Sequence, residues 1–275
     1  MKEKINVSEL KNRALSLLEG KWQSGIVVNL LFVIIFIISG IFKGLLGFGS
    51  VVLDNGGHVV LSIVIDFITA FVVVGINNGA FLGWTSSFYK LENQDDKLTY
   101  DSYSEFLTTR FKTSFLYGIG YSFFVCVWGL GFNLAGIISM YFATKVNALF
   151  GLLFITLGSI AIVAGIFVVI VKVIEYSMAR YIILDKPDIK IRKALKESKT
   201  LIYGYKMNYF MMILKFIGWI FLVIVTFGIA ALWVGSYWGT TEAQFYRKLK
   251  KIKKLNNRKD SSPDINEFLN NDIEY

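Results

Sequence analysis

Long apolar runs with no charge or a single charge constrain this chain more than any other feature of its sequence. A bilayer core about 30 Å thick needs roughly 20 mostly apolar residues in a helix. Runs of this kind cover residues 25–42, 59–76, 115–138, 148–171 and 208–233. Charged residues form only 18% of the 275 residues, whereas a soluble domain carries about a quarter. The sequence therefore predicts an all-α, polytopic membrane protein.

The last run is too long for one span and too short for two spans joined by a polar loop. A tight turn at Phe227 and Gly228 divides it into spans over 208–226 and 228–246, which makes six spans. Short cytoplasmic loops carry the excess of basic residues. With both termini cytoplasmic, all Lys and Arg residues outside the membrane lie on the inner side, except Lys43 and Lys145. We expect this topology in the bacterial cytoplasmic membrane.

The chain divides into an N-terminal amphipathic helix within 1–23, the six-span domain over 24–246, and a tail over 247–275 that is first basic and then acidic. In the N-terminal helix, Asn6 is placed to cap the first turn and Glu9 to complete a capping box. One face carries Val7, Leu10, Ala14, Leu17 and Leu18. Such a face suits the inner membrane surface and the end of the helical bundle equally well.

A second amphipathic helix is predicted over 188–203, in the connection between the fourth and fifth spans. Its flank is basic, and so is the start of the tail. Cations near the inner surface attract anionic lipid by about 1 kcal/mol each. The candidate headgroup contacts are Lys190, Lys193, Lys196, Lys199, Arg247, Lys248, Lys250 and Lys251. For any single lysine among them, the alternative is an ordinary solvated surface charge.

Small residues recur every four positions in two of the predicted spans. They are Gly75, Gly79 and Gly83 in one helix, and Ala231, Gly235 and Gly239 in another. Such ridges let helix backbones approach closely where lipid offers no hydrophobic advantage. We expect them to pack helices within this bundle rather than to form a dimer interface.

Two charges fall near the middle of predicted spans, Asp66 in the second and Lys215 in the fifth. An isolated charge at that depth costs about 3 kcal/mol on insertion scales, so the two are predicted to form an intramembrane pair if their spans are neighbours. Alternatively, the Lys215 side chain extends to the inner surface. Local ion pairs are predicted near the inner span ends, among Arg180, Asp185, Glu242 and Arg247.

The most specific pattern lies in the last hundred residues. It consists of Tyr176 to Tyr181, Asp185, Pro187, Ala194, Leu195, Ser198 and Gly204, then Phe216 to Trp219, Thr226, Gly228, Ile229, Thr240, Ala243, Phe245 and Tyr246. Near the N-terminus Leu10, Ala14, Leu17, Gly20 and Trp22 belong to it. The pattern resembles domain of unknown function family 975, multi-pass membrane proteins found mostly in Gram-positive bacteria. Lys215 and Ser236 depart from it, where the family often has a small polar residue and a proline. The resemblance implies an architecture and no reaction, cofactor or substrate.

Residues that could carry catalysis are scarce. His58 is the single histidine and Cys126 the single cysteine, so neither a zinc set nor a Ser-His-Asp triad can be assembled. The Gly47-Phe48-Gly49 sequence lacks the third glycine and the preceding strand of a dinucleotide loop. No catalytic, metal or cofactor site is predicted. Nucleic acid is not expected as a partner, because membrane topology accounts for the basic surplus.

The predicted function is that of a non-enzymatic accessory, interaction or protective component of the cell envelope. It would bind membrane lipids, a membrane peptide or a protein partner through its basic inner face. The alternative is a small transporter or permease subunit. A charged cavity lined by Asp66, Lys215, Asn29 and Asn133 would favour the transporter, whereas a solid bundle with an amphipathic inner collar would favour the accessory role.

Overall fold

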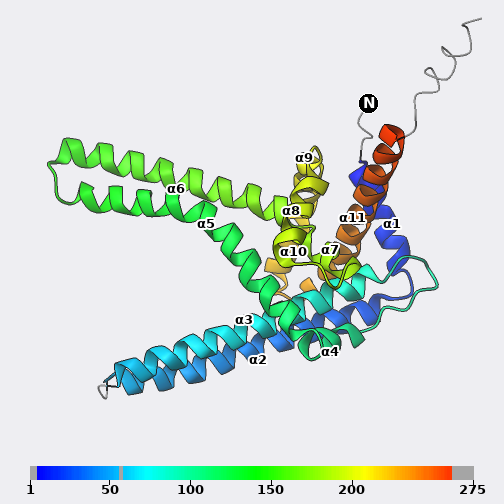
Figure 1. Cartoon of the computed structure of the whole chain (residues 1–275), viewed down its shortest axis with the longest axis horizontal. Helices are drawn as coiled ribbons and strands as arrows, with labels where there is room; N and C mark the ends of the chain where they lie inside the picture. The colour runs from blue at the N-terminus through cyan, green and yellow to red at the C-terminus, as the bar shows by residue number, and fades with distance from the viewer. Residues whose placement is uncertain (1–4, 56–57, 262–275) are drawn as a thin grey trace, which may run out of the picture.

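The computed structural model describes residues 5–55 and 58–261, and in this part of the chain all regular structure is helical. The predicted all-α class is therefore confirmed. The acidic end of the predicted tail, residues 262–275, lies outside the described residues. Two long helical hairpins form arms that extend from a base made of several short helices and one long C-terminal helix (Figure 1).

The first arm pairs α2 (Trp22–Asn55) with α3 (Val59–Tyr89), and the second pairs α5 (Phe111–Ala143) with α6 (Ala148–Tyr176). Large apolar side chains are exposed along both arms, among them Phe36, Ile38, Phe67, Leu149 and Phe167. Contiguous apolar surface of this extent is typical of membrane contact. The short helix α4 (Asp101–Leu107) packs on α3 near the base.

Four helical stretches are long and apolar enough to cross a membrane, and they are Trp22–Gly49, Val59–Tyr89, Leu149–Asp185 and Lys206–Val225. Helix α5 bends by 44° between Val125 and Val127, and its two halves make a fifth candidate if they form one span. Helices of this length and composition are typical of a membrane protein. The last helix, α11 (Ala231–Ser261), is not among the candidates, because polar and basic residues interrupt its apolar part.

The first predicted span, 25–42, is much shorter than the helix that contains it. Helix α2 continues through Lys43 and Gly44 to Asn55, so most of the expected external connection is helical. The sequence predicts that Lys43 lies just after the first span, on the outer side. In the structure Lys43 and Gly44 are exposed within α2, and a charge and small residues do not interrupt a helix that packs on one side only.

The turn near Gly228 lies where the sequence divides the fifth run. Helix α10 (Ile217–Val225) ends there, and α11 begins at Ala231. Phe227 and Gly228 both have positive φ, 50° and 91°. The Gly228 backbone N–H donates to the Val223 carbonyl at 2.8 Å, a pattern that closes a helix C-terminus. The chain therefore reverses within a few residues, without a polar loop.

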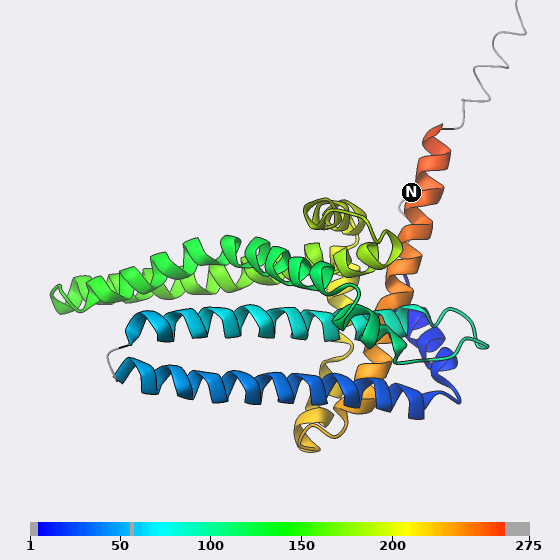
Figure 2. The ribbon, with the colours of Figure 1, turned by 60° about the horizontal axis from the view of Figure 1, so that its bottom comes forward.

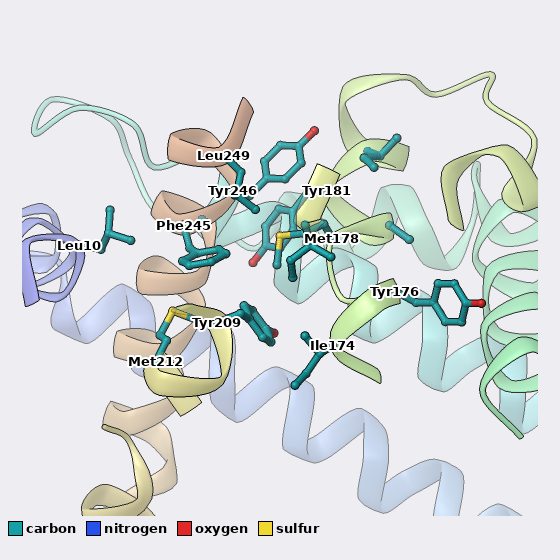
Figure 3. Close-up of a cluster of buried hydrophobic side chains, with 14 of the residues drawn as sticks. Leu10, Ile174, Tyr176, Met178, Tyr181, Tyr209, Met212, Phe245, Tyr246 and Leu249 are labelled. Atoms are coloured by element: carbon teal, nitrogen blue, oxygen red, sulfur yellow. The ribbon is translucent and has the colours of Figure 1, made fainter. Parts of the chain in front are cut away.

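The base holds the main hydrophobic core. It gathers α1 (Val7–Leu18), α7 (Ala179–Asp185), α8 (Ile191–Ile202), α9 (Lys206–Leu214) and α11, which runs across the foot of the arms (Figure 2). Figure 3 shows its aromatic centre, in which the Tyr181 and Tyr246 rings stack at 5.1 Å and Tyr209 meets Phe245 edge-on at 5.4 Å. Much of the stabilising burial therefore lies at one end of the arms.

Helix α1 belongs to this core. The Asn6 side chain accepts the backbone N–H groups of Ser8 and Glu9 at the helix start. All five apolar residues of the predicted face are buried, mainly against α11. The periodicity of α1 suits both the inner membrane surface and the end of the helical bundle. In the structure α1 packs on the end of the bundle.

The glycine ridge of α3 faces α4 and the start of α5. A Cβ added at Gly75 would lie 2.5 Å from the Phe111 ring, and one at Gly83 would lie 2.9 Å from the Tyr103 Cα. A Cβ at Gly79 would meet the Phe106 carbonyl at 3.0 Å. On α11, Gly235 lies against Asn29 and Gly239 against Phe88, whereas Ala231 is only half-buried. Both ridges serve close helix approach within the chain.

Candidate functional site

A buried ion pair lies at the centre of the base. The Arg180 guanidinium on α7 contacts the Glu242 carboxylate on α11, and their exposed fractions are 8% and 0%. Tyr209 on α9 donates its hydroxyl to Glu242 Oε1 at 2.6 Å. The guanidinium also lies over the Phe81 ring, 4.6 Å from its centroid. This buried cluster joins residues of four helices, α3, α7, α9 and α11.

A second cluster surrounds Asp185 at the end of α7. Its carboxylate accepts the Tyr89 hydroxyl, the Tyr246 hydroxyl at 2.6 Å and the Lys250 ammonium at 2.6 Å. The structure thus pairs Asp185 with Lys250, and pairs Glu242 with Arg180. Arg247 instead donates to the backbone carbonyls of Tyr89 and Leu91, which fixes the end of α3 to α11.

The Asp185 cluster forms one wall of a hollow of about 830 Å³ between α7, α8 and α11. Its charged lining consists of Lys186, Lys193, Lys196, Lys250, Lys253, Asp185 and Glu197. The two carboxylates are already paired, Glu197 with Lys186 at 2.7 Å and Asp185 with Lys250. Among the described residues no carboxylate pairs with the other three lysines. The hollow therefore has surplus positive charge at its rim.

Helix α8 supplies much of that charge. Its residues Ala194, Leu195, Ser198 and Ile202 are buried, and the Ser198 hydroxyl donates to the Glu175 carbonyl at 2.8 Å. The four lysines predicted as headgroup contacts on this helix, Lys190, Lys193, Lys196 and Lys199, are all exposed. Lys193 and Lys196 line the hollow, and Lys190 lines a smaller one beside it.

A second basic hollow, of about 610 Å³, lies between α1, the end of α3 and α11. It contains the four predicted contacts of the tail, Arg247, Lys248, Lys250 and Lys251, together with Arg13 and Lys254. Two carboxylates, Glu9 and Glu92, also line it. Gln244 completes the wall with an exposed fraction of 3%, and its Nε2 has no hydrogen-bond partner within residues 5–55 and 58–261.

The packing does not bring Asp66 and Lys215 together. Asp66 is exposed on α3, about 27 Å along the helix from Trp84 at the base, at 1.5 Å per residue. Lys215 follows α9 and donates to the Ser8 hydroxyl on α1 at 2.8 Å. Burial lowers the pKa of the neighbouring Lys11, and the positive charge of Lys215 lowers it further. Lys215 therefore has a hydrogen-bond partner on the N-terminal helix, and the alternative, in which its side chain extends to the inner membrane surface, stays a prediction.

Asn29 is the most fully bonded polar residue of α2. Its Nδ2 donates to the Leu232 carbonyl and the Ser236 hydroxyl of α11, at 2.8 and 2.7 Å. Its Oδ1 accepts the Trp84 indole N–H at 2.8 Å. Asn133, by contrast, donates only to the Gly129 carbonyl of its own helix. Asn29, Asn133, Asp66 and Lys215 therefore lie in separate surroundings, and none of them lines either basic hollow.

Several residues of these sites were not identified from the sequence. Tyr89 and Tyr209 look like ordinary span residues, since nothing in a hydropathy pattern marks a hydroxyl that bonds a carboxylate on another helix. Gln244 offered a weak signal, because it stands one turn before the basic run on an otherwise buried helix face. His58 is exposed at the start of α3, and the side chain of Cys126 lies outside the described residues.

One protein-family model matches residues 1–253, and its description is protein of unknown function (DUF975). This match confirms the resemblance seen in the sequence. No curated protein and no solved structure matches the chain. Among the described residues there is also no group of three or more His, Cys, Asp or Glu side chains that could hold a metal ion.

Proposed function

Since the chain belongs to the DUF975 family of proteins of unknown function, we propose from its own geometry that it is a non-enzymatic accessory protein of the bacterial cytoplasmic membrane that binds anionic lipid headgroups. The arms would cross the bilayer, and the base would lie at the inner surface. Lipid is the partner that both the apolar arms and the basic base have in common.

One observation carries this proposal: the apolar residues of α8 and of the described C-terminal part of α11, such as Leu195 and Ile252, are buried, while cations beside them are exposed, namely Lys190, Lys193, Lys196 and Lys199 on α8 and Lys250, Lys251 and Lys254 on α11. The apolar face of α8 is buried in the chain, so the helix is held with its lysines outward. The carboxylates of the adjoining hollow are used by Lys186 and Lys250. An inner leaflet rich in anionic lipid offers the missing negative charge. We call Lys190, Lys193, Lys196 and Lys199 the α8 collar.

The transporter alternative has less support. A transport path through the bundle needs polar groups that line a common water-filled space. Asn29 has its hydrogen bonds satisfied by Trp84, Ser236 and Leu232, and Lys215 is engaged by Ser8. A third hollow, of about 450 Å³ between α1, α10 and α11, is lined almost entirely by apolar side chains, three of them tryptophans.

The α8 collar is tested by replacing its four lysines with glutamine. The protein is placed in phosphatidylcholine membranes that contain a spin-labelled lipid, either phosphatidylglycerol or phosphatidylcholine. The spin label reports how much of each lipid is immobilised at the protein. We expect the wild type to prefer phosphatidylglycerol over phosphatidylcholine. In the variant this preference should fall roughly tenfold or more, because each cation removed contributes about 1 kcal/mol of attraction to anionic lipid. High salt should weaken the wild-type preference in the same direction.

The matched control is the pair Lys43→Gln and Lys145→Gln, which removes one exposed cation from α2 and one from the turn between α5 and α6. It should change the preference far less than the collar variant, because neither lysine belongs to a cluster. Equal preference in the wild type and the collar variant would refute the proposal.

We also propose the six-span topology with both termini cytoplasmic, which accounts for the distribution of basic residues. In a Cys126→Ser background, Asn12→Cys and Lys254→Cys should resist an impermeant thiol reagent in intact cells, whereas His58→Cys should react. All three native side chains are exposed in the structure, so a lack of reaction reports the membrane side and not burial. Reaction at Lys254→Cys alone would mean an odd number of spans and an external tail.

A further inference from the structure

We infer that the hollow between α1 and α11 binds a phosphate monoester, with Gln244 and Arg247 in its wall and Arg13 and Lys251 at its rim. This inference rests on the proposed lipid-binding function and names a headgroup chemistry for one part of the basic face. The site is distinct from the α8 collar, which lies on the other hollow.

The first argument is the unpaired amide of Gln244. This side chain is almost fully buried, it lines the hollow, and its Nε2 has no acceptor among the described residues. A buried donor without a partner costs about 1–3 kcal/mol, so such groups in native structures call for an explanation. An anionic oxygen bound in the hollow would supply the acceptor that the chain does not.

The second argument is the charge of the lining. Six Lys or Arg side chains face two carboxylates there. Glu92 is only 3.9 Å from Arg247, and Lys250 is already bonded to Asp185. Within the described part of the chain, no carboxylate forms an ion pair with Arg13, Lys251 or Lys254. This excess suits a dianion better than a singly charged group.

The third argument is the position of the Arg247 guanidinium. Its two terminal nitrogens donate to the carbonyls of Tyr89 and Leu91, which holds the planar group in place, while its ion-pair partner Glu92 lies 3.9 Å away and is largely exposed. A fixed guanidinium loses little conformational freedom when it binds a phosphate, unlike a free lysine. Gln244 and Arg247 are three residues apart on α11, so they lie on one face of the helix.

A phosphate monoester reaches such a site from two sources. It is the headgroup of phosphatidic acid, and it is also present in soluble compounds such as glycerol 3-phosphate. The hollow of about 610 Å³ is larger than a phosphate alone and has room for a glycerol unit. Phosphatidylglycerol, a diester with one negative charge, should bind the collar and be a poor ligand here.

The test uses the full chain in phosphatidylcholine nanodiscs. Titration calorimetry with glycerol 3-phosphate measures the soluble ligand, and immobilisation of spin-labelled phosphatidic acid against phosphatidylglycerol measures the lipid. We expect saturable binding in at least one of these two measurements, and the one that shows it identifies the source of the phosphate monoester. Gln244→Leu and Arg13→Gln should each weaken that binding about tenfold, as expected for loss of one hydrogen bond or contact to a charged group.

Matched controls separate the site from general effects. Thr241→Val changes a buried residue one turn earlier on α11 that bonds only its own helix, and Lys112→Gln removes one exposed charge from α5. Both should bind like the wild type. Wild-type affinity in the Gln244→Leu variant, or no binding in either the calorimetric or the spin-label measurement, would overturn the inference.

The two proposals fail separately. If the collar variant loses its phosphatidylglycerol preference while neither phosphate monoester binds, only the present inference is wrong. If glycerol 3-phosphate or phosphatidic acid binds in a Gln244-dependent way while the collar variant keeps its preference, the site stands and the collar function does not.

Discussion

Glu242→Leu is expected to lower the free energy of unfolding by about 3–5 kcal/mol, because it leaves the buried Arg180 guanidinium without its counter-charge. The Tyr209 hydroxyl loses its acceptor in the same variant. The measurement is unfolding of the detergent-solubilised protein by sodium dodecyl sulfate, followed by tryptophan fluorescence. Since the pair joins α7, α9 and α11, the whole base should unfold at lower denaturant.

The double variant Arg180→Met with Glu242→Leu should recover much of that loss, because it leaves neither charge unpaired in the core. The control is Glu197→Leu, which breaks the exposed pair with Lys186 and should cost about 1 kcal/mol or less. Additive losses from the two single variants would show that Arg180 and Glu242 do not stabilise each other.

Asn29→Leu is expected to have the second largest effect, a loss of about 2–4 kcal/mol. It removes the acceptor of the Trp84 indole N–H and the donor to Ser236 and to the Leu232 carbonyl. Each buried polar group left without a partner costs about 1–3 kcal/mol. The same unfolding assay measures the effect, and near-ultraviolet circular dichroism should report altered packing of Trp84.

Asn133→Leu is the matched control, since Asn133 is also an asparagine in a long apolar helix. It bonds only the Gly129 carbonyl four residues earlier, and that carbonyl keeps its place in the helix. Its replacement should cost less than about 1 kcal/mol. Equal losses at Asn29 and Asn133 would mean that the contact between α2, α3 and α11 contributes little.

The sequence predicted those features that depend on neighbouring residues along the chain. Asn6 predicted the start of α1, and the 3.6-residue repeat of apolar residues predicted every residue of its buried face. Both succeeded because capping and periodicity act within a few turns. The reversal at Phe227 and Gly228 followed from the length of the apolar run. The α2 boundary was missed at Lys43, because hydropathy measures the affinity of a segment for lipid and not where its backbone hydrogen bonds end.

Contacts between helices were predicted poorly. Asp66 and Lys215 have similar predicted depths, but depth along each span does not say which spans are neighbours. Arg180, Asp185, Glu242 and Arg247 were recognised as a set of charges near the base, whereas their pairing depends on how α7 crosses α11. Gln244 gave little signal, because burial without a partner is a property of the packed structure.

The contact between α1 and α11 joins the two ends of the described chain and so sets an order of events during synthesis. Helix α1 is complete by residue 18, whereas its partner begins at residue 231. At about 5–20 residues per second, roughly 10 to 40 s separate the two on the ribosome. For that interval the apolar face of α1 lacks its main partner, and the membrane surface is the apolar phase within reach. We therefore expect this face to contact lipid first and α11 afterwards.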